Sequence, residues 1–248
     1  MNKTIIVPFL LTGSIAASHA AAIYLGDTRN AGTPPAGITN PNDATSNLDG
    51  WNSNMVIMNG QGYSVDAGDV SGGNALVVTE FNFMAGAVRG RVTPFIAEVV
   101  SPTEFNILAV GDTRVSGVDY NSVGIHNLSF SNAGAVDLSS SVSAGMVIAA
   151  GFLNSNADGT NTTSPGSVIP FNGNVAGGDQ WYNGNSAVDT YPAGVATVGN
   201  NLSAAPAAGV NNRAYEFNIG LEVTSVPEPG TGLAGIVGLG LLAFKRRR

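Results

Sequence analysis

The stretch Tyr215-Glu216-Phe217-Asn218-Ile219-Gly220-Leu221-Glu222-Val223 alternates apolar and polar residues. Successive side chains of a β-strand point to opposite faces of the sheet, so alternation with period two predicts a strand with one apolar face. We expect one side of this strand to lie on a core and the other to face solvent. The stretch therefore predicts a β fold.

Other runs of the chain have the length and composition of strands. They are 55–58, 76–84, 89–100, 105–110, 123–130 and 145–153. Runs 105–110 and 145–153 are apolar on both faces, which predicts central strands. Pro94 predicts an edge strand or a bulge, because proline cannot donate to a β-ladder. With Gly, Asn and Asp turns between the runs, the sequence predicts an all-β domain, a two-sheet antiparallel β-sandwich of jelly-roll type.

The composition narrows the classes of function. The chain has 248 residues and a formal net charge of −7. Between Ile23 and Thr224, sixteen acidic residues stand against five arginines. Such a domain would be repelled by nucleic acid and by anionic membrane surfaces, so no nucleic-acid partner is expected. The absence of cysteine excludes disulfides, cysteine-ligated zinc and thiol catalysis.

The first twenty residues have the layout of a secretory signal peptide. Lys3 precedes an apolar run at 5–17, and the small residues Ser18 and Ala20 stand at the −3 and −1 positions. Cleavage is predicted after Ala20, with Ala22 as the second choice. A buried first strand or helix is the alternative.

The last residues combine three parts in order. Val226-Pro227-Glu228-Pro229 is followed by an apolar segment at 230–244 and by the basic terminus Lys245-Arg246-Arg247-Arg248. At ~1.5 Å per residue a helix over that segment reaches about 22 Å, and flanking basic side chains can extend its span. The segment is therefore predicted to be transmembrane, with its basic end cytoplasmic. An ordinary C-terminal anchor with a proline linker is the alternative.

This order of parts resembles the PEP-CTERM sorting signal of exported bacterial proteins. The resemblance implies that residues 226–229 are the sorting motif, 230–244 the span and 245–248 the stop. It implies processing by an exosortase, a membrane-embedded cysteine peptidase. It further implies transient anchoring in the inner membrane of a Gram-negative bacterium that makes exopolysaccharide and biofilm matrix. The predicted organisation is a signal peptide at 1–20, an exported domain at 21–224 and a sorting segment at 225–248.

Glycan binding is the sharper hypothesis for the exported domain. Sugar rings stack on exposed aromatic side chains, and amide groups bind their hydroxyls. Trp51 lies in the polar stretch 26–54, and Gln180-Trp181-Tyr182-Asn183 lies in the polar stretch 177–212. Both stretches are predicted to be surface loops with short strands. The alternative is that each tryptophan folds back to cap one end of the sandwich.

Metal binding and catalysis have weaker support in the sequence. Asn154, Asn156 and Asp158 offer oxygen ligands around a glycine turn, which suits calcium, although ordinary turns explain the same residues. No other cofactor is expected. His126 is predicted to be a solvent-facing strand residue rather than a catalytic base. The candidate glycosidase carboxylates are Glu80, Glu98 and Glu104.

The sequence therefore predicts an exported protein of the cell surface or extracellular matrix, processed at its C-terminal signal. A structural or adhesive role in exopolysaccharide or biofilm follows, with extracellular polysaccharide as a partner besides the exosortase. A secreted carbohydrate-active enzyme is the alternative.

Overall fold

The computed structural model describes residues 22–26, 54–57, 62–86, 88–102, 104–155, 169, 171–173, 180–183, 198–199, 201–202 and 213–225. In these residues the chain forms β-strands and one 3-10 turn, η2 (Ala67–Asp69). The strands are β1 (Ile23–Gly26), β2 (Asn54–Ile57), β3 (Tyr63–Ser64), β4 (Asn74–Ala85), β5 (Arg91–Ser101), β6 (Glu104–Val110), β7 (Arg114–Val115), β8 (Gly124–Ser129), β9 (Val136–Asp137), β10 (Val147–Ser155), β11 (Phe171–Gly173), β12 (Gln180–Asn183), β13 (Asn201–Leu202), β14 (Arg213–Tyr215) and β15 (Phe217–Ser225).

A five-stranded antiparallel sheet contains both the first and the last strand. Its order is β1-β15-β4-β8, with β9 also on β4. The nine residues of β15 all pair with β4, from Phe217 opposite Phe83 to Ser225 opposite Asn74. The shorter β1 pairs only with the residues from Asn218 to Leu221. One edge of β15 is thus paired with β4 along its whole length, and the other edge is paired with β1 over four residues.

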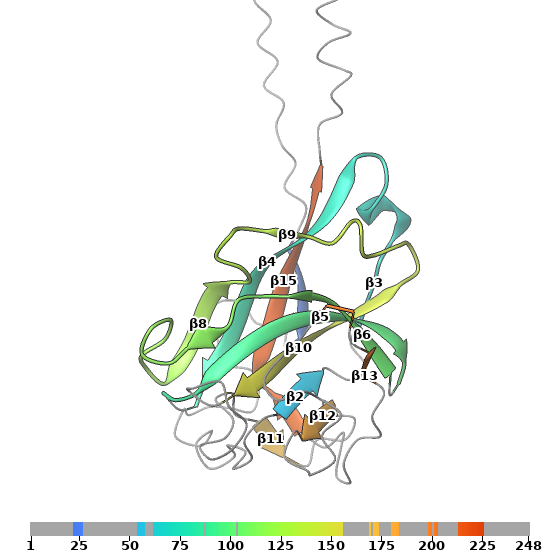
Figure 1. Cartoon of the computed structure of the whole chain (residues 1–248). Coiled ribbons are helices and arrows are strands. Elements are labelled where there is room, and N and C mark those ends of the chain that lie inside the picture. Colours follow the sequence, from blue (N-terminus) through green and yellow to red (C-terminus); the bar gives the residue numbers. More distant parts are fainter. Residues whose placement is uncertain are drawn as a thin grey trace, which may run out of the picture.

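An eight-stranded antiparallel sheet forms the second layer (Figure 1). Its order is β12-β2-β10-β5-β6-β13, with β3 on β10 and β7 on β5. Strand β10 is buried from Ile148 to Leu153, which confirms the prediction of a central strand there. In β5, Ile96 joins the main core while Phe95 and Ala97 join a second cluster. Since neighbouring residues point to opposite faces, this sheet buries side chains on both sides.

The two sheets face each other across an aromatic core. Phe152 of β10 packs edge-on against Phe217 of β15, with ring centroids 4.7 Å apart, and against Tyr215 at 5.5 Å. In the same sheet as Phe217, Phe81 stacks on Phe83 at 4.9 Å, and Phe83 lies directly opposite Phe217. These rings are 1% exposed or less, and burying each contributes about 1.5–3 kcal/mol. The described residues thus form a two-layer unit, called the two-sheet body below.

The stretch 215–223 is not one strand, as the alternation predicts, but two. Tyr215 ends β14 and pairs with Phe171, whereas Phe217 begins β15 and pairs with Phe83. At the break, the Met84 amide donates to the Glu216 carbonyl at 3.0 Å. The apolar alternation continues through the bend, so the pattern could not show that the chain changes partners there.

Of the two predicted alternatives for Pro94, an edge strand or a bulge, the edge strand is wrong because β5 is central. The register of β5 with β6 shifts two residues later, between Ile96 and Ala97. Pro94 pairs with Phe152 of β10, and its carbonyl accepts a hydrogen bond from the Gly111 amide at 2.9 Å. A strand residue points its nitrogen and its carbonyl to the same side. The proline nitrogen therefore faces residues 111–113, the break between β6 and β7, where no ladder bond is lost.

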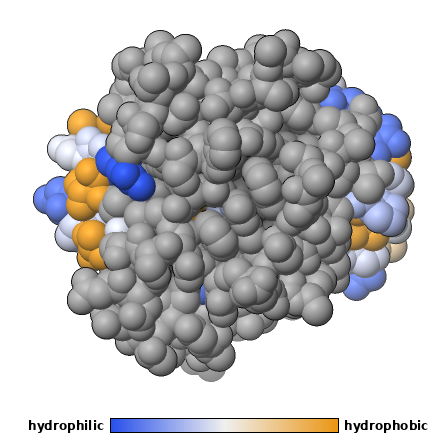
Figure 2. Space-filling model, turned by 90° about the horizontal axis from the view of Figure 1, so that it is seen from below, coloured by the Kyte–Doolittle hydropathy of each residue, from blue (hydrophilic) through white to orange (hydrophobic). Residues whose placement is uncertain are grey.

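The described two-sheet body begins and ends at the same end. Ile23 of β1 lies opposite Leu221 of β15, and β15 then runs on to Ser225. Strands β2 and β12 lie at the opposite end (Figure 1). Viewed from that opposite end, the described residues are visible at the two sides, where hydrophilic and hydrophobic residues are mixed (Figure 2).

Nothing among the described residues is a helix long and apolar enough to cross a bilayer. The predicted span 230–244 and the predicted signal peptide 1–20 lie outside the described residues, so both stay predictions.

Candidate functional site

The last four residues of β15 connect the two-sheet body to the C-terminal segment. Glu222, Val223 and Thr224 are partly exposed and Ser225 is exposed, whereas the residues from Phe217 to Leu221 are all buried. Among the described residues, these four pair with β4 alone, because β1 reaches only Leu221. A side-chain bond from the Thr224 hydroxyl to the Ala75 carbonyl, 3.3 Å long, adds to this ladder. Within β15, these four residues therefore have fewer pairing strands and less burial than the residues before them.

A polar cluster covers the neighbouring part of β15. Asn82 donates through Nδ2 to the Asn218 amide oxygen at 2.9 Å and to the Glu80 carboxylate at 3.1 Å. Tyr24 of β1 donates to the same carboxylate at 3.5 Å. Burial, followed by the negative charge of Glu80, raises the pKa of the Tyr24 phenol. A methyl group on Gly220 would lie 3.1 Å from Glu80 Cβ and 3.4 Å from the Tyr24 ring, so the glycine makes room for both side chains. The cluster fixes β1 against β15.

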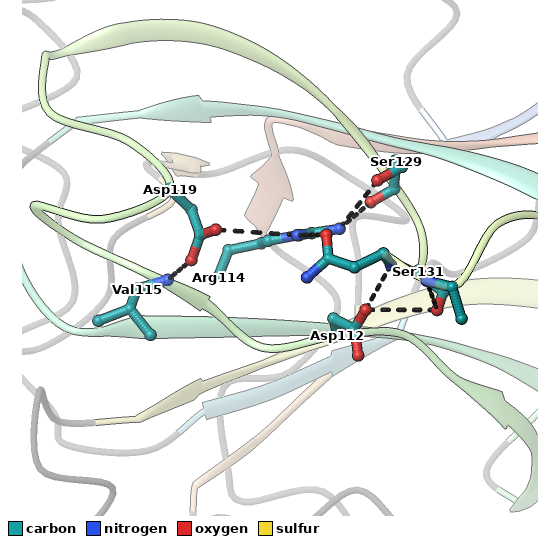
Figure 3. Close-up of polar contacts among 8 residues, drawn as sticks. Asp112, Arg114, Val115, Asp119, Ser129 and Ser131 are labelled. Carbon is teal, nitrogen blue, oxygen red and sulfur yellow. Dashed lines mark hydrogen bonds and ion pairs between the residues drawn. The ribbon is translucent and has the colours of Figure 1, made fainter.

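Arg114 forms a second polar cluster that sequence analysis missed (Figure 3). Its guanidinium is 3% exposed and donates to the Asn132 amide oxygen at 2.7 Å and to the Ser129 carbonyl. Asp119 lies on its other side, 3.8 Å away, and also accepts the Val115 amide at 2.7 Å. Arginine suits this place because its planar head donates in several directions at once. The cluster ties the turn at 116–120 to the end of β8.

Asp112 extends this cluster to the turn after β8. Its carboxylate accepts hydrogen bonds from the Asn132 amide and, at 3.3 Å, from the Ser131 hydroxyl (Figure 3). These contacts join β7 and the residues on either side of it to the end of β8 and the turn that follows, so the arrangement supports a structural role. The Gly-Asp-Thr-Arg stretch at 111–114 also occurs at 26–29. That short repeat was the only sequence signal near this cluster, and it does not indicate burial of the arginine.

The three candidate glycosidase carboxylates do not form one group. Glu80 belongs to the five-stranded sheet, while Glu98 and Glu104 belong to the eight-stranded sheet. Glu98 accepts a hydrogen bond from Asn106 at 3.0 Å. Asn201 donates to both Glu104, at 2.8 Å, and Asn106, at 2.9 Å. Amide groups thus bind both carboxylates of the second sheet, as in a structural ladder of side chains.

The proposed glycan-contact residues lie in a strand or outside the described residues. Gln180–Asn183, predicted to lie in a polar loop, instead forms one of the short strands expected in this stretch: β12, the edge strand paired with β2. Trp and Tyr favour strands, and the surrounding Gly and Asn residues concealed this preference in the sequence. Trp51 lies outside the described residues. Glycan contact at these positions stays a prediction.

The predicted calcium ligands are only partly described. Asn154 lies in β10, with its backbone opposite Val92, while Asn156 and Asp158 are outside the described residues. Within the described part of the chain, no three His, Asp or Glu side chains are grouped as metal ligands would be. Calcium binding at this turn stays a prediction.

His126 is half-buried rather than solvent-facing. Its ring packs at 5.5 Å from both Phe83 and Tyr120, and Nε2 donates to the Ser122 carbonyl at 2.9 Å. The side chain therefore packs at the edge of the hydrophobic core, which the alternation in β8 did not reveal.

The end of β15 leads directly into the C-terminal residues that match a known family. Residues 225–248 match the family model described as the PEP-CTERM protein-sorting motif. The chain carries a PEP-CTERM sorting signal. This confirms the resemblance seen in Val226–Pro229, the apolar segment and the basic terminus, and it implies export and exosortase processing. No curated protein and no solved structure matches the chain. The matched residues 226–248 lie outside the described ones, so β15 is the described part nearest to the signal.

Proposed function

We propose that the chain is an exported protein of the cell surface or extracellular matrix of a Gram-negative bacterium, with a structural or adhesive role in exopolysaccharide or biofilm. The supporting observation is that the sorting signal begins where β15 ends. A jelly-roll topology, removal of 1–20 and transient anchoring through 230–244 complete the proposal. The matrix role adds to the export and processing that the sorting signal implies.

The two-sheet body would be held by one end. Its first strand pairs with its last, Ile23 opposite Leu221, so both segments directed to the membrane leave from neighbouring strands. Cleavage after Ala20 would leave two residues before β1. Strands β2 and β12 lie at the other end (Figure 1). During anchoring that end would point away from the membrane, towards the matrix.

Processing is tested with the full chain in a bacterium that has an exosortase and in the same strain lacking it. We expect a product shortened at the C-terminus in the first strain only, and we expect the double variant Pro227→Ala/Glu228→Gln to keep its tail. Glu104→Gln is the matched control, because it removes a glutamate from β6, away from β15 and from the signal. Intact wild-type protein in the first strain, or full-length protein in the cytosol, would refute the proposal.

Glycan contact is the finer part of the proposal. Among the described residues β12 pairs with β2 alone, and it contains Trp181 and Tyr182 at the end of the body away from the anchor. We expect retention on the producer's own polysaccharide to fall about tenfold in Trp181→Ala and in Trp51→Ala, as expected for the loss of ~1.4 kcal/mol. Tyr24→Ala removes an exposed aromatic ring from the anchored end and should leave retention unchanged. Equal retention in all variants would refute this part.

The enzyme alternative is tested in the same preparations. Release of reducing sugar by the wild type, lost in Glu98→Gln, would replace the binding proposal by a glycosidase. The hydrogen bonds that Asn106 donates to Glu98 and Asn201 donates to Glu104 give that alternative no geometric support.

A further inference from the structure

The sorting signal follows the two-sheet body without a linker. Residue 225 is the last residue of β15 and the first residue of the family match. Val226 to Pro229 extended at ~3.3 Å per residue span about 13 Å. The polar headgroup layer takes up roughly 5–7 Å of that length on each side of a bilayer. A membrane-embedded peptidase acting near this motif would therefore work almost against the folded sheets.

The end of β15 can supply more length at low cost. Among the described residues, Glu222 to Ser225 pair with β4 alone, and their side chains are partly or fully exposed. Releasing them adds about 13 Å of extended chain. Further release is opposed at Leu221, which is fully buried and is the first residue paired with β1.

We propose that Glu222–Ser225 belongs to the segment that the sorting peptidase binds. These four residues leave β4 and extend the substrate, while β1 holds β15 from Leu221 backwards. The body stays folded during processing. This inference rests on the proposed processing by an exosortase.

A disulfide across the last part of the ladder tests the inference. Thr224 lies directly opposite Ala75, and directly opposite residues have Cα atoms about 4.5–5.5 Å apart, which a disulfide can bridge. The chain has no cysteine of its own, so Ala75→Cys/Thr224→Cys offers a single intramolecular disulfide, and non-reducing gel electrophoresis separates it from disulfide-linked dimers. The matched control is Asn82→Cys/Asn218→Cys, which locks the same two strands where β1 also pairs. Both are expressed as full chains in the strain with the exosortase.

We expect processing to slow at least tenfold in the Thr224 lock and to stay at the wild-type rate in the Asn218 lock. A Gly-Ser-Gly-Ser insertion between Ser225 and Val226 should restore processing of the Thr224 lock, because the inserted residues replace the released ones. Processing of the Thr224 lock as fast as the control would overturn the inference. A block that the insertion does not relieve would also overturn it, since missing length would then not be the cause. If the wild type is not processed, the failure lies with the proposed function instead.

Discussion

The two parts of β15 differ although they form one strand. From Phe217 to Leu221 the strand is buried and pairs with β4, and from Asn218 to Leu221 it also pairs with β1. Phe217 contacts Phe152 of the other sheet. From Glu222 to Ser225 it is partly exposed and pairs only with β4 among the described residues. The difference arises from the length of β1, because β4 covers both parts. A short neighbouring strand can therefore divide one strand into a structural part and a part that opens.

The largest effect is expected from shortening one side chain in each part. Phe217→Ala should lower the free energy of unfolding by about 3–5 kcal/mol, because it leaves a cavity beside Phe152. Val223→Ala should lower it by about 1 kcal/mol, since Val223 is only partly buried. Urea unfolding of both variants measures the difference. Equal losses would show that the two parts are equally well packed.

The glycines between β1 and β15 test how β1 holds the first part. Gly26 has a φ of 119°, and a Cβ there would lie 2.5 Å from the Phe217 carbonyl oxygen. Gly26→Ala should therefore cost about 2–4 kcal/mol, since the backbone must move. A Cβ at Gly220 would lie 3.1 Å from Glu80 Cβ, so Gly220→Ala should cost about 1 kcal/mol.

Loss of β1 should also extend the segment that opens. In Gly26→Ala the stop at Leu221 would be weakened, and limited proteolysis should then cut β15 before Glu222 as well as after it. Cutting confined to residues after Leu221 in this variant would argue that burial, rather than β1, sets the limit.

Hydrogen exchange compares the two parts directly. We expect the amides of Ile219 and Leu221 to exchange only when the whole body unfolds. Those of Val223 and Ser225 should exchange on the order of 100-fold faster, through local opening. Mass spectrometry of peptides ending on either side of Leu221 would resolve this. Uniform protection along β15 would contradict the comparison on which the inference rests.

Local pattern was enough to predict most of the larger strands. The runs at 76–84, 123–130 and 145–153 correspond to β4, β8 and β10, because period-two alternation or continuous apolar character follows from burial on one face or both. The break at Glu216 was missed because a change of strand partner leaves the alternation intact. Of the two alternatives for Pro94, the edge strand was wrong because the ladder is interrupted beside it, at 111–113 between β6 and β7, and β5 itself is central.

Of the candidate sites, the sorting signal could be recognised because it is linear. Its motif, apolar segment and basic terminus are contiguous in the sequence, and the family match confirms them. The Arg114 cluster could not be predicted, because Asp119, Ser129 and Asn132 reach it from separate turns. The weaker pairing of Glu222 was equally invisible, since it depends on β1 beginning at Ile23, opposite Leu221.

The smallest expected effect concerns the Tyr24 hydroxyl on β1. Its bond to Glu80 is 3.5 Å long and 37% of Tyr24 is exposed, so Tyr24→Phe should change stability by less than about 0.5 kcal/mol at pH 7.

Burial and the charge of Glu80 raise the pKa of this phenol above 10.0 in the folded chain. Its contribution is therefore complete below pH 10 and is lost as the pH rises through the folded value. Tyr24→Phe should lose less stability than the wild type above pH 10, while Tyr63, whose pKa burial and Asp69 also raise, is common to both chains. Identical alkaline unfolding of the two chains would show that packing of the ring over Gly220, and not its hydroxyl, is what fixes β1 to the first part of β15.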